Sequence, residues 1–225
     1  MHRTRIKICG VTRVEDAVAA VELGADAIGI VLHPPARRYV PPERAREIAH
    51  AVPAFTTTVG LFVDRDPQQL RWESSIAGVR VVQLHGNETP QTVAAEVAWT
   101  VVKAVKVRPG RLADDLRVWR RSAFPGPMYN LAGLVLETDT AAPGGTGVAN
   151  DWDEIARARD AGAFEGLPPI IAAGGLTPET VADVVRRLRP YAVDVSSGVE
   201  DGPVGVKSQA RIEAFVRAVR EADNS

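Results

Sequence analysis

The sequence alternates short apolar runs, rich in valine and isoleucine, with amphipathic segments, and this pair occurs eight times along the chain. The eight runs are Arg5–Val11, Ala27–Leu32, Thr56–Val63, Val81–His85, Thr100–Val107, Gly133–Thr138, Pro169–Gly174 and Ala192–Ser197. Each has about the usual length of a β-strand, and each is followed by a helical pattern. Strands covered on both faces are continuously apolar, as in Ile28–Leu32, so the pattern predicts a parallel sheet.

The helical segments carry start signals of their own. Thr12 is the expected N-cap of a first helix over Val14–Leu23, with Glu15 as its capping-box partner and Gly24 as its end. Proline also stands where later helices are expected to begin, at Pro41-Pro42-Glu43, Pro67, Thr89-Pro90 and Thr177-Pro178-Glu179. These signals support a regular strand–helix alternation.

Eight β/α units within 225 residues match the size of a single-domain (β/α)8 TIM barrel, which needs roughly 200–250 residues. The rival fold is an open doubly wound sheet. A dinucleotide-binding fold should show G-x-G-x-x-G after its first strand, but Cys9–Arg13 lacks it. The sequence therefore predicts one α/β domain over residues 1–225, with a closed, all-parallel sheet.

Composition excludes several classes of function. The formal charge is −1 with interspersed signs, so there is no basic stripe for nucleic acid and no polybasic segment for a membrane surface. No apolar run approaches the roughly 20 residues that span a bilayer. The N-terminus lacks a signal-peptide pattern and the one cysteine has no internal partner, which indicates a cytoplasmic setting. The four histidines show no metal-ligand spacing, so we predict no metal.

In a barrel of this kind the active site lies where the strands end. The candidates by that criterion are Cys9, His33, Arg37, Arg38, Asp64, His85, Gly86, Lys106, Glu137, Asp139, Gly174, Gly175, Asp194, Ser196, Ser197 and Gly198. Gly174-Gly175 and Ser197-Gly198 follow strands seven and eight, where exposed backbone N–H groups can surround a phosphate. The alternative is that these glycines only make tight turns.

A free cysteine is usually a small buried hydrophobe, but Cys9 lies at the mouth of a barrel strand, where a thiol facing an acid is arranged for proton transfer. Lys7 shares its face and is a supporting residue, either for that thiol or as an ion-pair partner inside the barrel. One of Arg37 and Arg38 is suited to bind a substrate carboxylate, and the other is a solvated charge. His85 lines the pocket or serves as a hydrogen-bonded structural group.

In these residues the chain resembles the phosphoribosylanthranilate isomerase family, single-domain barrels of tryptophan biosynthesis. The motifs that carry the resemblance are Lys7-Ile8-Cys9-Gly10-Val11-Thr12, Gly24–Gly29 with Arg38-Tyr39, Val59–Val63, Val82–Gly86, Gly144–Gly147 with Asp151-Trp152, Ala173–Leu176 and Asp194–Glu200. They follow the family's order over almost the whole chain. Each motif alone is weak evidence for the family, but the motifs together are specific to it.

The resemblance implies an Amadori rearrangement of N-(5-phosphoribosyl)anthranilate without a cofactor, in a monomer or a homodimer. It implies that Cys9 is the general base and that an acid at the end of strand six is the general acid. Arg38 would then bind the anthranilate carboxylate, with Asp194 near the sugar. The backbone of Gly174, Gly175, Ser197 and Gly198 would bind the phosphate, and Lys7 and His85 would complete the substrate site.

The sequence departs from the family at the acid. Where the family has aspartate, this chain has Glu137, and Asp139 follows on the face predicted by strand alternation. Either residue is a candidate acid. The departure also leaves open a related isomerase that acts on a different phosphoribosyl aminoaldose. A third possibility is a non-catalytic protein that binds a phosphorylated ligand.

Overall fold

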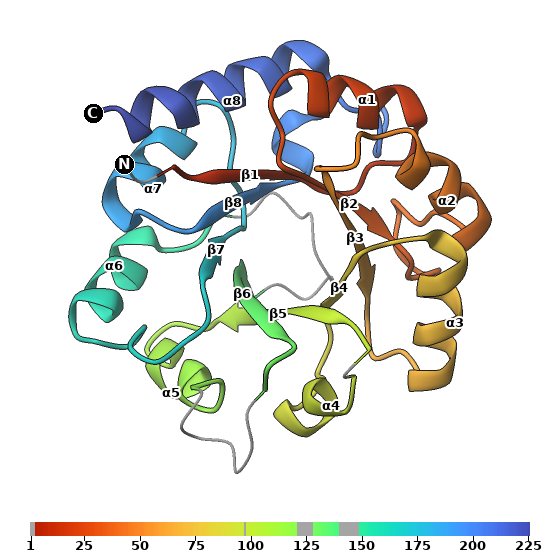
Figure 1. Cartoon of the computed structure of the whole chain (residues 1–225). Helices are drawn as coiled ribbons and strands as arrows, with labels where there is room; N and C mark the ends of the chain where they lie inside the picture. The colour runs from red at the N-terminus through yellow and green to blue at the C-terminus, as the bar shows by residue number, and fades with distance from the viewer. Residues whose placement is uncertain (1–2, 97, 121–127, 140–148) are drawn as a thin grey trace.

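The computed structural model describes residues 3–96, 98–120, 128–139 and 149–225. Its strands form one closed barrel in the order β1 to β8, with β8 pairing back onto β1, and helices surround it (Figure 1). All eight neighbouring pairs are parallel. The predicted barrel is therefore confirmed. The Gly144–Gly147 motif lies outside the described residues.

The strands are β1 (Arg5–Ile8), β2 (Ala27–Val31), β3 (Thr57–Phe62), β4 (Val81–Leu84), β5 (Thr100–Val107), β6 (Leu131–Thr138), β7 (Ile170–Ala172) and β8 (Ala192–Val195). The helices are α1 (Val14–Glu22), α2 (Pro42–His50), α3 (Pro67–Ala77), α4 (Pro90–Ala95), α5 (Leu112–Arg117), α6 (Trp152–Asp160), α7 (Val181–Leu188) and α8 (Gln209–Asp223), with a 3-10 turn η2 (Ser197–Val199). All eight predicted strands are present, but most end one to three residues earlier than predicted. Cys9 is thus the first residue after β1 rather than a residue within it.

Two predicted helix starts are wrong. The Thr12 hydroxyl donates to the Gly205 carbonyl at 2.8 Å instead of capping α1, which begins after Arg13 without a side-chain cap. Pro178 lies in a turn, and α7 begins only at Val181. Proline does stand in the first turn of α2, α3 and α4, where its missing N–H leaves no helical bond unmade.

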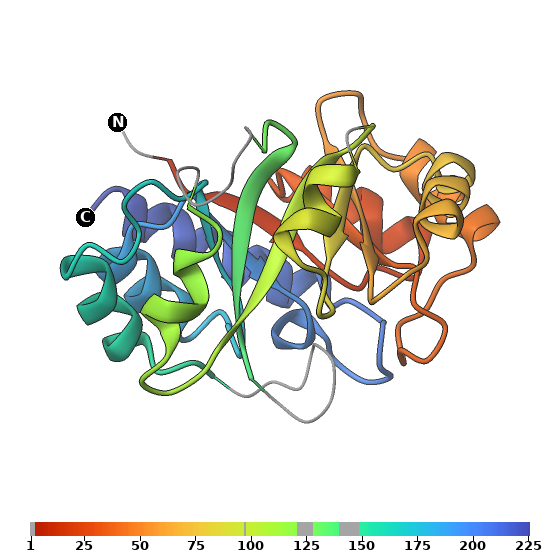
Figure 2. The ribbon, with the colours of Figure 1, turned by 90° about the horizontal axis from the view of Figure 1, so that it is seen from below.

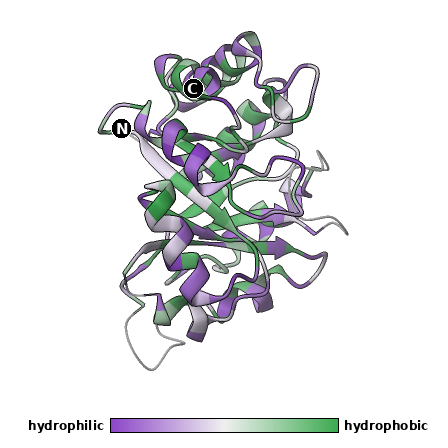
Figure 3. Cartoon of the chain, turned by 90° about the vertical axis from the view of Figure 1, so that its right-hand side faces the viewer, coloured by the Kyte–Doolittle hydropathy of each residue, from purple (hydrophilic) through white to green (hydrophobic). Residues whose placement is uncertain are grey.

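Strand alternation divides the barrel into two packed regions. Outward-facing residues such as Ile6, Ile28 and Leu134 join the large core between the strands and the helices. A smaller inner cluster of Ala104, Val135, Ile171, Ala173 and Ala192 fills the barrel itself. The side view shows the helices packed around the strands (Figure 2), and the strands are mostly hydrophobic while the helices are mixed (Figure 3). The inner positions near the carboxyl ends of the strands carry the polar groups described next.

No helix within the described residues combines the length and the apolar character needed to cross a membrane.

Candidate active site

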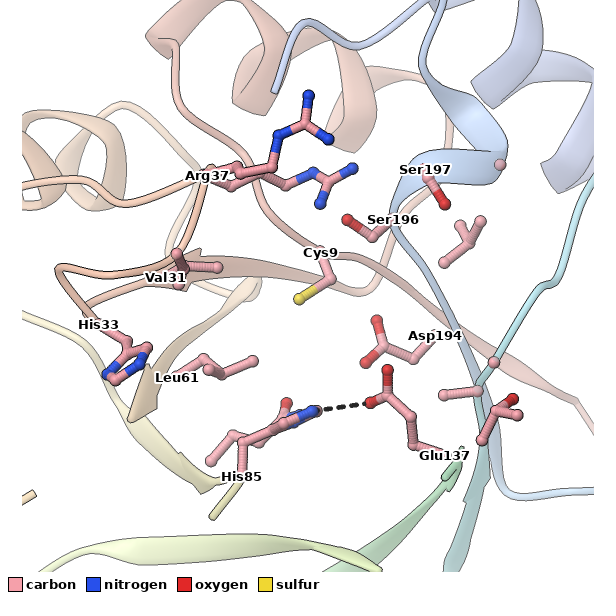
Figure 4. Close-up of a pocket in the computed structure, with 18 of the residues that line it drawn as sticks. Cys9, Val31, His33, Arg37, Leu61, His85, Glu137, Asp194, Ser196 and Ser197 are labelled. Carbon is pink, nitrogen blue, oxygen red and sulfur yellow. Dashed lines mark hydrogen bonds and ion pairs between the residues drawn. The ribbon is translucent and has the colours of Figure 1, made fainter. Parts of the chain in front are cut away.

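A cavity of about 300 Å³ opens at the carboxyl ends of the strands. Figure 4 shows the side chains that point into it. Among the predicted site residues, those that line it are Cys9, Arg38, His85, Glu137, Gly174, Gly175, Asp194, Ser197 and Gly198, together with the positional candidates His33, Arg37 and Ser196. Lys7 is not one of the lining residues, but it pairs with Asp194, which is. Asp64, Gly86, Lys106 and Asp139 are not among the lining residues of the described chain.

Cys9 occupies an apolar part of the wall, packed with Val31 and Leu61 and only 7% exposed. Gly29 on the neighbouring strand leaves room for the thiol, because a Cβ there would lie 2.8 Å from Sγ. Burial raises the pKa of Cys9 above its ordinary value, and the Asp194 carboxylate raises it further, while the Lys7 and Lys207 ammonium groups lower it in part. The sulfur points into the pocket (Figure 4).

Lys7 and Asp194 form a buried ion pair beside this thiol. The Lys7 Nζ lies 2.6 Å from Asp194 Oδ2, on adjacent strands that pair in register. Burial lowers the pKa of Lys7, but the Asp194 carboxylate and the Cys9 sulfur together more than offset this, so the pKa lies above its ordinary value and the lysine is charged. The other Asp194 oxygen, Oδ1, is buried without a hydrogen-bond partner in the described chain. Asp194 itself is one of the residues that line the pocket.

Glu137, near the end of β6, faces the pocket at 17% side-chain exposure. Its Oε2 lies 3.0 Å from His85 Nε2 (Figure 4). Asp139 behaves differently: its side chain is 39% exposed and lies 3.5 Å from Lys106 Nζ. The alternation that was expected to place both acids on one face ends with β6 at Thr138. Only Glu137 lines the pocket.

The loop after β4, which carries His85, is held from behind by buried charges. Lys103 Nζ lies 3.1 Å from Glu88 Oε2 and donates to the Gly86 carbonyl at 2.8 Å. Glu88 in turn accepts the Gly86 N–H at 2.9 Å and the Asp64 N–H at 2.9 Å. Asp64 is thus part of this support, because its carboxylate accepts the Asn87 N–H. These bonds fix the backbone next to His85.

Glu200 joins two cations on the other side of the pocket. Its two oxygens accept from Arg38 Nε at 2.7 Å and Nη2 at 2.8 Å, a bidentate pair that fixes the guanidinium plane. Lys207, whose side chain is fully buried, lies 2.9 Å from Glu200 Oε1. Burial would raise the pKa of Glu200, but Arg38 and Lys207 hold it below its ordinary value. The three charges leave one net positive charge at this wall.

The loops after β7 and β8 bring backbone together closely. Gly174 has φ of +94°, and a Cβ there would lie 2.4 Å from Thr138 Oγ1, so a side chain fits neither the backbone nor the space. Gly175 also has positive φ, and the 3-10 turn η2 begins at Ser197. Consecutive backbone N–H groups in such conformations form concave anion sites.

The described residues contain no group of three or more His, Cys, Asp or Glu side chains arranged to hold a metal ion.

Comparison with known proteins places this geometry in a family. The family model of N-(5'-phosphoribosyl)anthranilate isomerase matches residues 6–218. The chain belongs to this family. It is 43% identical over 224 residues to the N-(5'-phosphoribosyl)anthranilate isomerase of Dechloromonas aromatica, with 99% of each chain covered. It is 44% identical over 221 residues to that of Pseudomonas aeruginosa, with 98% of this chain and 97% of the relative covered.

Solved structures of family members have the same fold. The phosphoribosyl anthranilate isomerase of Thermotoga maritima superposes with a TM-score of 0.83 at 37% identity, covering 97% of this chain and 99% of that one. A second structure holds a family member in complex with reduced 1-(o-carboxyphenylamino)-1-deoxyribulose 5-phosphate. It superposes with a TM-score of 0.80 at 34% identity, covering 97% and 99% of the two chains. The family resemblance inferred from the motifs is confirmed.

Three polar residues of this site had no role in the prediction from sequence: Gln83 and Lys207, which are buried, and Glu200, which is partly buried. Glu200 and Lys207 lie in the long segment after β8, and no spacing rule signals that they pair with each other and with Arg38. Gln83 lies inside β4. A signal for it was present: Gln83 interrupts an apolar strand two residues before His85, so strand alternation places both on the inner face.

Proposed function

We propose that this chain catalyses the Amadori rearrangement of N-(5'-phosphoribosyl)anthranilate to 1-(o-carboxyphenylamino)-1-deoxyribulose 5-phosphate, with Glu137 as general acid and Cys9 as general base. One observation supports these roles above all: the side chains of Cys9 and Glu137 line the same cavity, and the glycine loops after β7 and β8 line it too. Membership of the family supports the reaction.

The substrate has two anionic groups, and the pocket has a complement for each. The backbone N–H groups around Gly174, Gly175, Ser197 and Gly198 bind the phosphate. Arg38 binds the anthranilate carboxylate through the part of its guanidinium that Glu200 leaves open, since Glu200 takes Nε and Nη2. The carboxylate of Asp194, which lines the pocket, accepts a hydroxyl of the ribose. The reacting carbons are then held between these anchors.

The first step is acid catalysis. Glu137 in its protonated form donates to the furanose ring oxygen, the C1–O bond breaks, and the nitrogen lone pair forms a C1=N Schiff base. His85, at 3.0 Å, orients the carboxyl group. Glutamate has one methylene more than the aspartate that the family resemblance implies at this position, and Glu137 lines the pocket.

The second step is base catalysis. The thiolate of Cys9 removes the proton from C2, and the electron pair moves through C1 to the iminium nitrogen to give an enolamine. Protonation of that intermediate at C1 and loss of the proton of the C2 hydroxyl give the aminoketose. The two protons added, at the ring oxygen and at C1, thus equal the two removed, from C2 and from its hydroxyl. Lys7 and Lys207 favour the thiolate electrostatically, against the burial that disfavours it.

The test of this function is turnover of N-(5'-phosphoribosyl)anthranilate, followed by the loss of its fluorescence. The wild-type protein should convert the substrate, and Cys9→Ala should lose activity by about 10²- to 10⁴-fold, the range for removal of a general base. Wild-type activity in Cys9→Ala would contradict the assignment. Growth of a tryptophan auxotroph that carries the wild-type gene tests the substrate in the cell, and failure to grow would favour a different phosphoribosyl aminoaldose.

The proposed base must stay a reduced thiol, and Cys9 has no second cysteine with which to pair. A reducing compartment suits this chemistry, so we place the enzyme in the cytoplasm.

A further inference from the structure

Gln83 is a buried amide inside the barrel that the proposed reaction does not use. It lies on β4 and is 1% exposed, although its side chain borders the cavity. Its Nε2 lies 3.2 Å from Nδ1 of His85, the first residue after β4. Its Oε1 is buried and has no hydrogen-bond partner in the described chain. The hydrogen bond to His85 is therefore the polar contact that the structure gives this amide.

The two contacts of His85 together select one form of its ring. A carboxylate or a carboxyl C=O at Oε2 of Glu137 accepts a hydrogen bond, so His85 Nε2, at 3.0 Å, carries a hydrogen and donates it. The Gln83 amide nitrogen is only a donor, so the Nδ1 that it faces must offer a lone pair. Both contacts are satisfied only by the neutral imidazole with its hydrogen on Nε2. A second hydrogen on Nδ1 would face the amide N–H.

We propose that Gln83 is a positioning residue for the general acid: it holds His85 as the neutral Nε2–H tautomer, so that the acid proton resides on Glu137. The inference rests on the proposed role of Glu137. An imidazolium at His85 would be the partner of an ionised Glu137, which has no proton to give to the ring oxygen. A neutral Nε2–H donor instead hydrogen-bonds Oε2 and leaves the proton of the carboxyl group for the substrate.

The packing of Gln83 supports a role beyond structure. A buried amide oxygen without a partner destabilises the folded state, and an apolar side chain of similar volume would avoid that loss. A glutamine at this position therefore costs stability, but it provides the donor that contacts His85. Gln83→Met removes the donor with little change of volume. Gln83→Glu keeps the shape and replaces the donor by an acceptor for Nδ1–H.

The experiment compares wild type, Gln83→Met and Gln83→Glu at one neutral pH. The ¹⁵N spectrum of the histidine rings, with the His85 signal assigned by its loss in His85→Asn, should show Nε2 protonated and Nδ1 bare in the wild type. In Gln83→Glu, the His85 Nδ1 should become protonated, and kcat should fall about tenfold or more while KM changes less than about twofold. In Gln83→Met, kcat should fall while the thermal midpoint stays the same or rises.

Three results would overturn the proposal. They are a wild-type His85 ring protonated on Nδ1, a Gln83→Glu protein with altered tautomer and unchanged kcat, and a Gln83→Met protein whose loss of kcat is matched by loss of folding. The ring spectrum needs no substrate, so it decides the tautomer even if the proposed reaction fails. Full activity in Glu137→Gln would overturn the acid assignment, and with it the role of Gln83, whatever the tautomer.

Discussion

The two sides of the pocket are built by different electrostatic means. The side formed by β1, β8 and the loops after β2 and β8 holds fixed ionic groups, the pair Lys7–Asp194 and the triad Arg38–Glu200–Lys207. The side formed by β4 and β6 holds a hydrogen-bonded series, Gln83–His85–Glu137, in which a proton has several places to reside. The difference indicates that the ionic side binds and orients the substrate, while the hydrogen-bonded side determines which group holds the acid proton.

The largest effect should follow from removing the acid on the second side. Glu137→Gln keeps the size of the side chain and its contact with His85 but cannot donate an acidic proton. We expect kcat for N-(5'-phosphoribosyl)anthranilate to fall by about 10²- to 10⁴-fold. The matched control is Asp139→Asn, whose carboxylate is more exposed and does not line the pocket. Loss of kcat in this control together with full activity in Glu137→Gln would assign the acid to Asp139 instead.

Removing a charge from the ionic side should lower the free energy of unfolding. Asp194→Asn leaves the Lys7 ammonium buried without its counter-ion, and removal of one member of a buried pair lowers the free energy of unfolding by about 3–5 kcal/mol. Urea unfolding followed by circular dichroism measures this. Asp183→Asn, which breaks the exposed pair with Arg186, should change stability by no more than about 0.5 kcal/mol. Equal effects in the two variants would show that burial of the Lys7 pair has no energetic consequence.

Substrate affinity should be the next to change, through the group that orients Arg38. Glu200→Gln removes the charge of a bidentate partner, so we expect KM to rise about tenfold with kcat altered much less. Asp201→Asn changes the neighbouring, exposed carboxylate and serves as the control. A fall of kcat at constant KM in Glu200→Gln would mean that this group acts in the chemical step rather than in binding.

A smaller effect is expected in the pH dependence of the reactivity of the Cys9 thiol. Burial raises the pKa of Cys9, so its alkylation by iodoacetamide should continue to accelerate above pH about 8.5, the ordinary thiol value. The Asp194 carboxylate also raises this pKa, while Lys7 lowers it. Asp194→Asn should therefore lower the pH at which the alkylation rate rises, so that alkylation at pH 8 is a few-fold faster than in the wild type. If the alkylation rate of Asp194→Asn rises at a higher pH than that of the wild type, Asp194 lowers the pKa of the thiol, which would contradict this account.

Much of the fold was predictable because periodicity and strand-end position are local properties of the sequence. The eight apolar runs predicted the barrel, and the rule that sites lie at strand ends selected Cys9 and Glu137 before the structure placed both in one pocket. The failure of Thr12 to cap α1 was not predictable, because its hydroxyl bonds Gly205, which is distant in sequence. The partnership of Arg38 with Glu200 likewise joins residues 162 positions apart. The choice between Glu137 and Asp139 depended on where β6 ends.

The measurement that tests the central claim most directly is the deuterium isotope effect on kcat with substrate labelled at C2, in Cys9→Ser and Glu137→Gln. If Cys9 removes the C2 proton, Cys9→Ser slows that step and the isotope effect should rise above the wild-type value. If Glu137 opens the ring, Glu137→Gln slows the earlier step, so its isotope effect should fall toward one. A larger isotope effect in Glu137→Gln than in Cys9→Ser would contradict the assignment of base and acid.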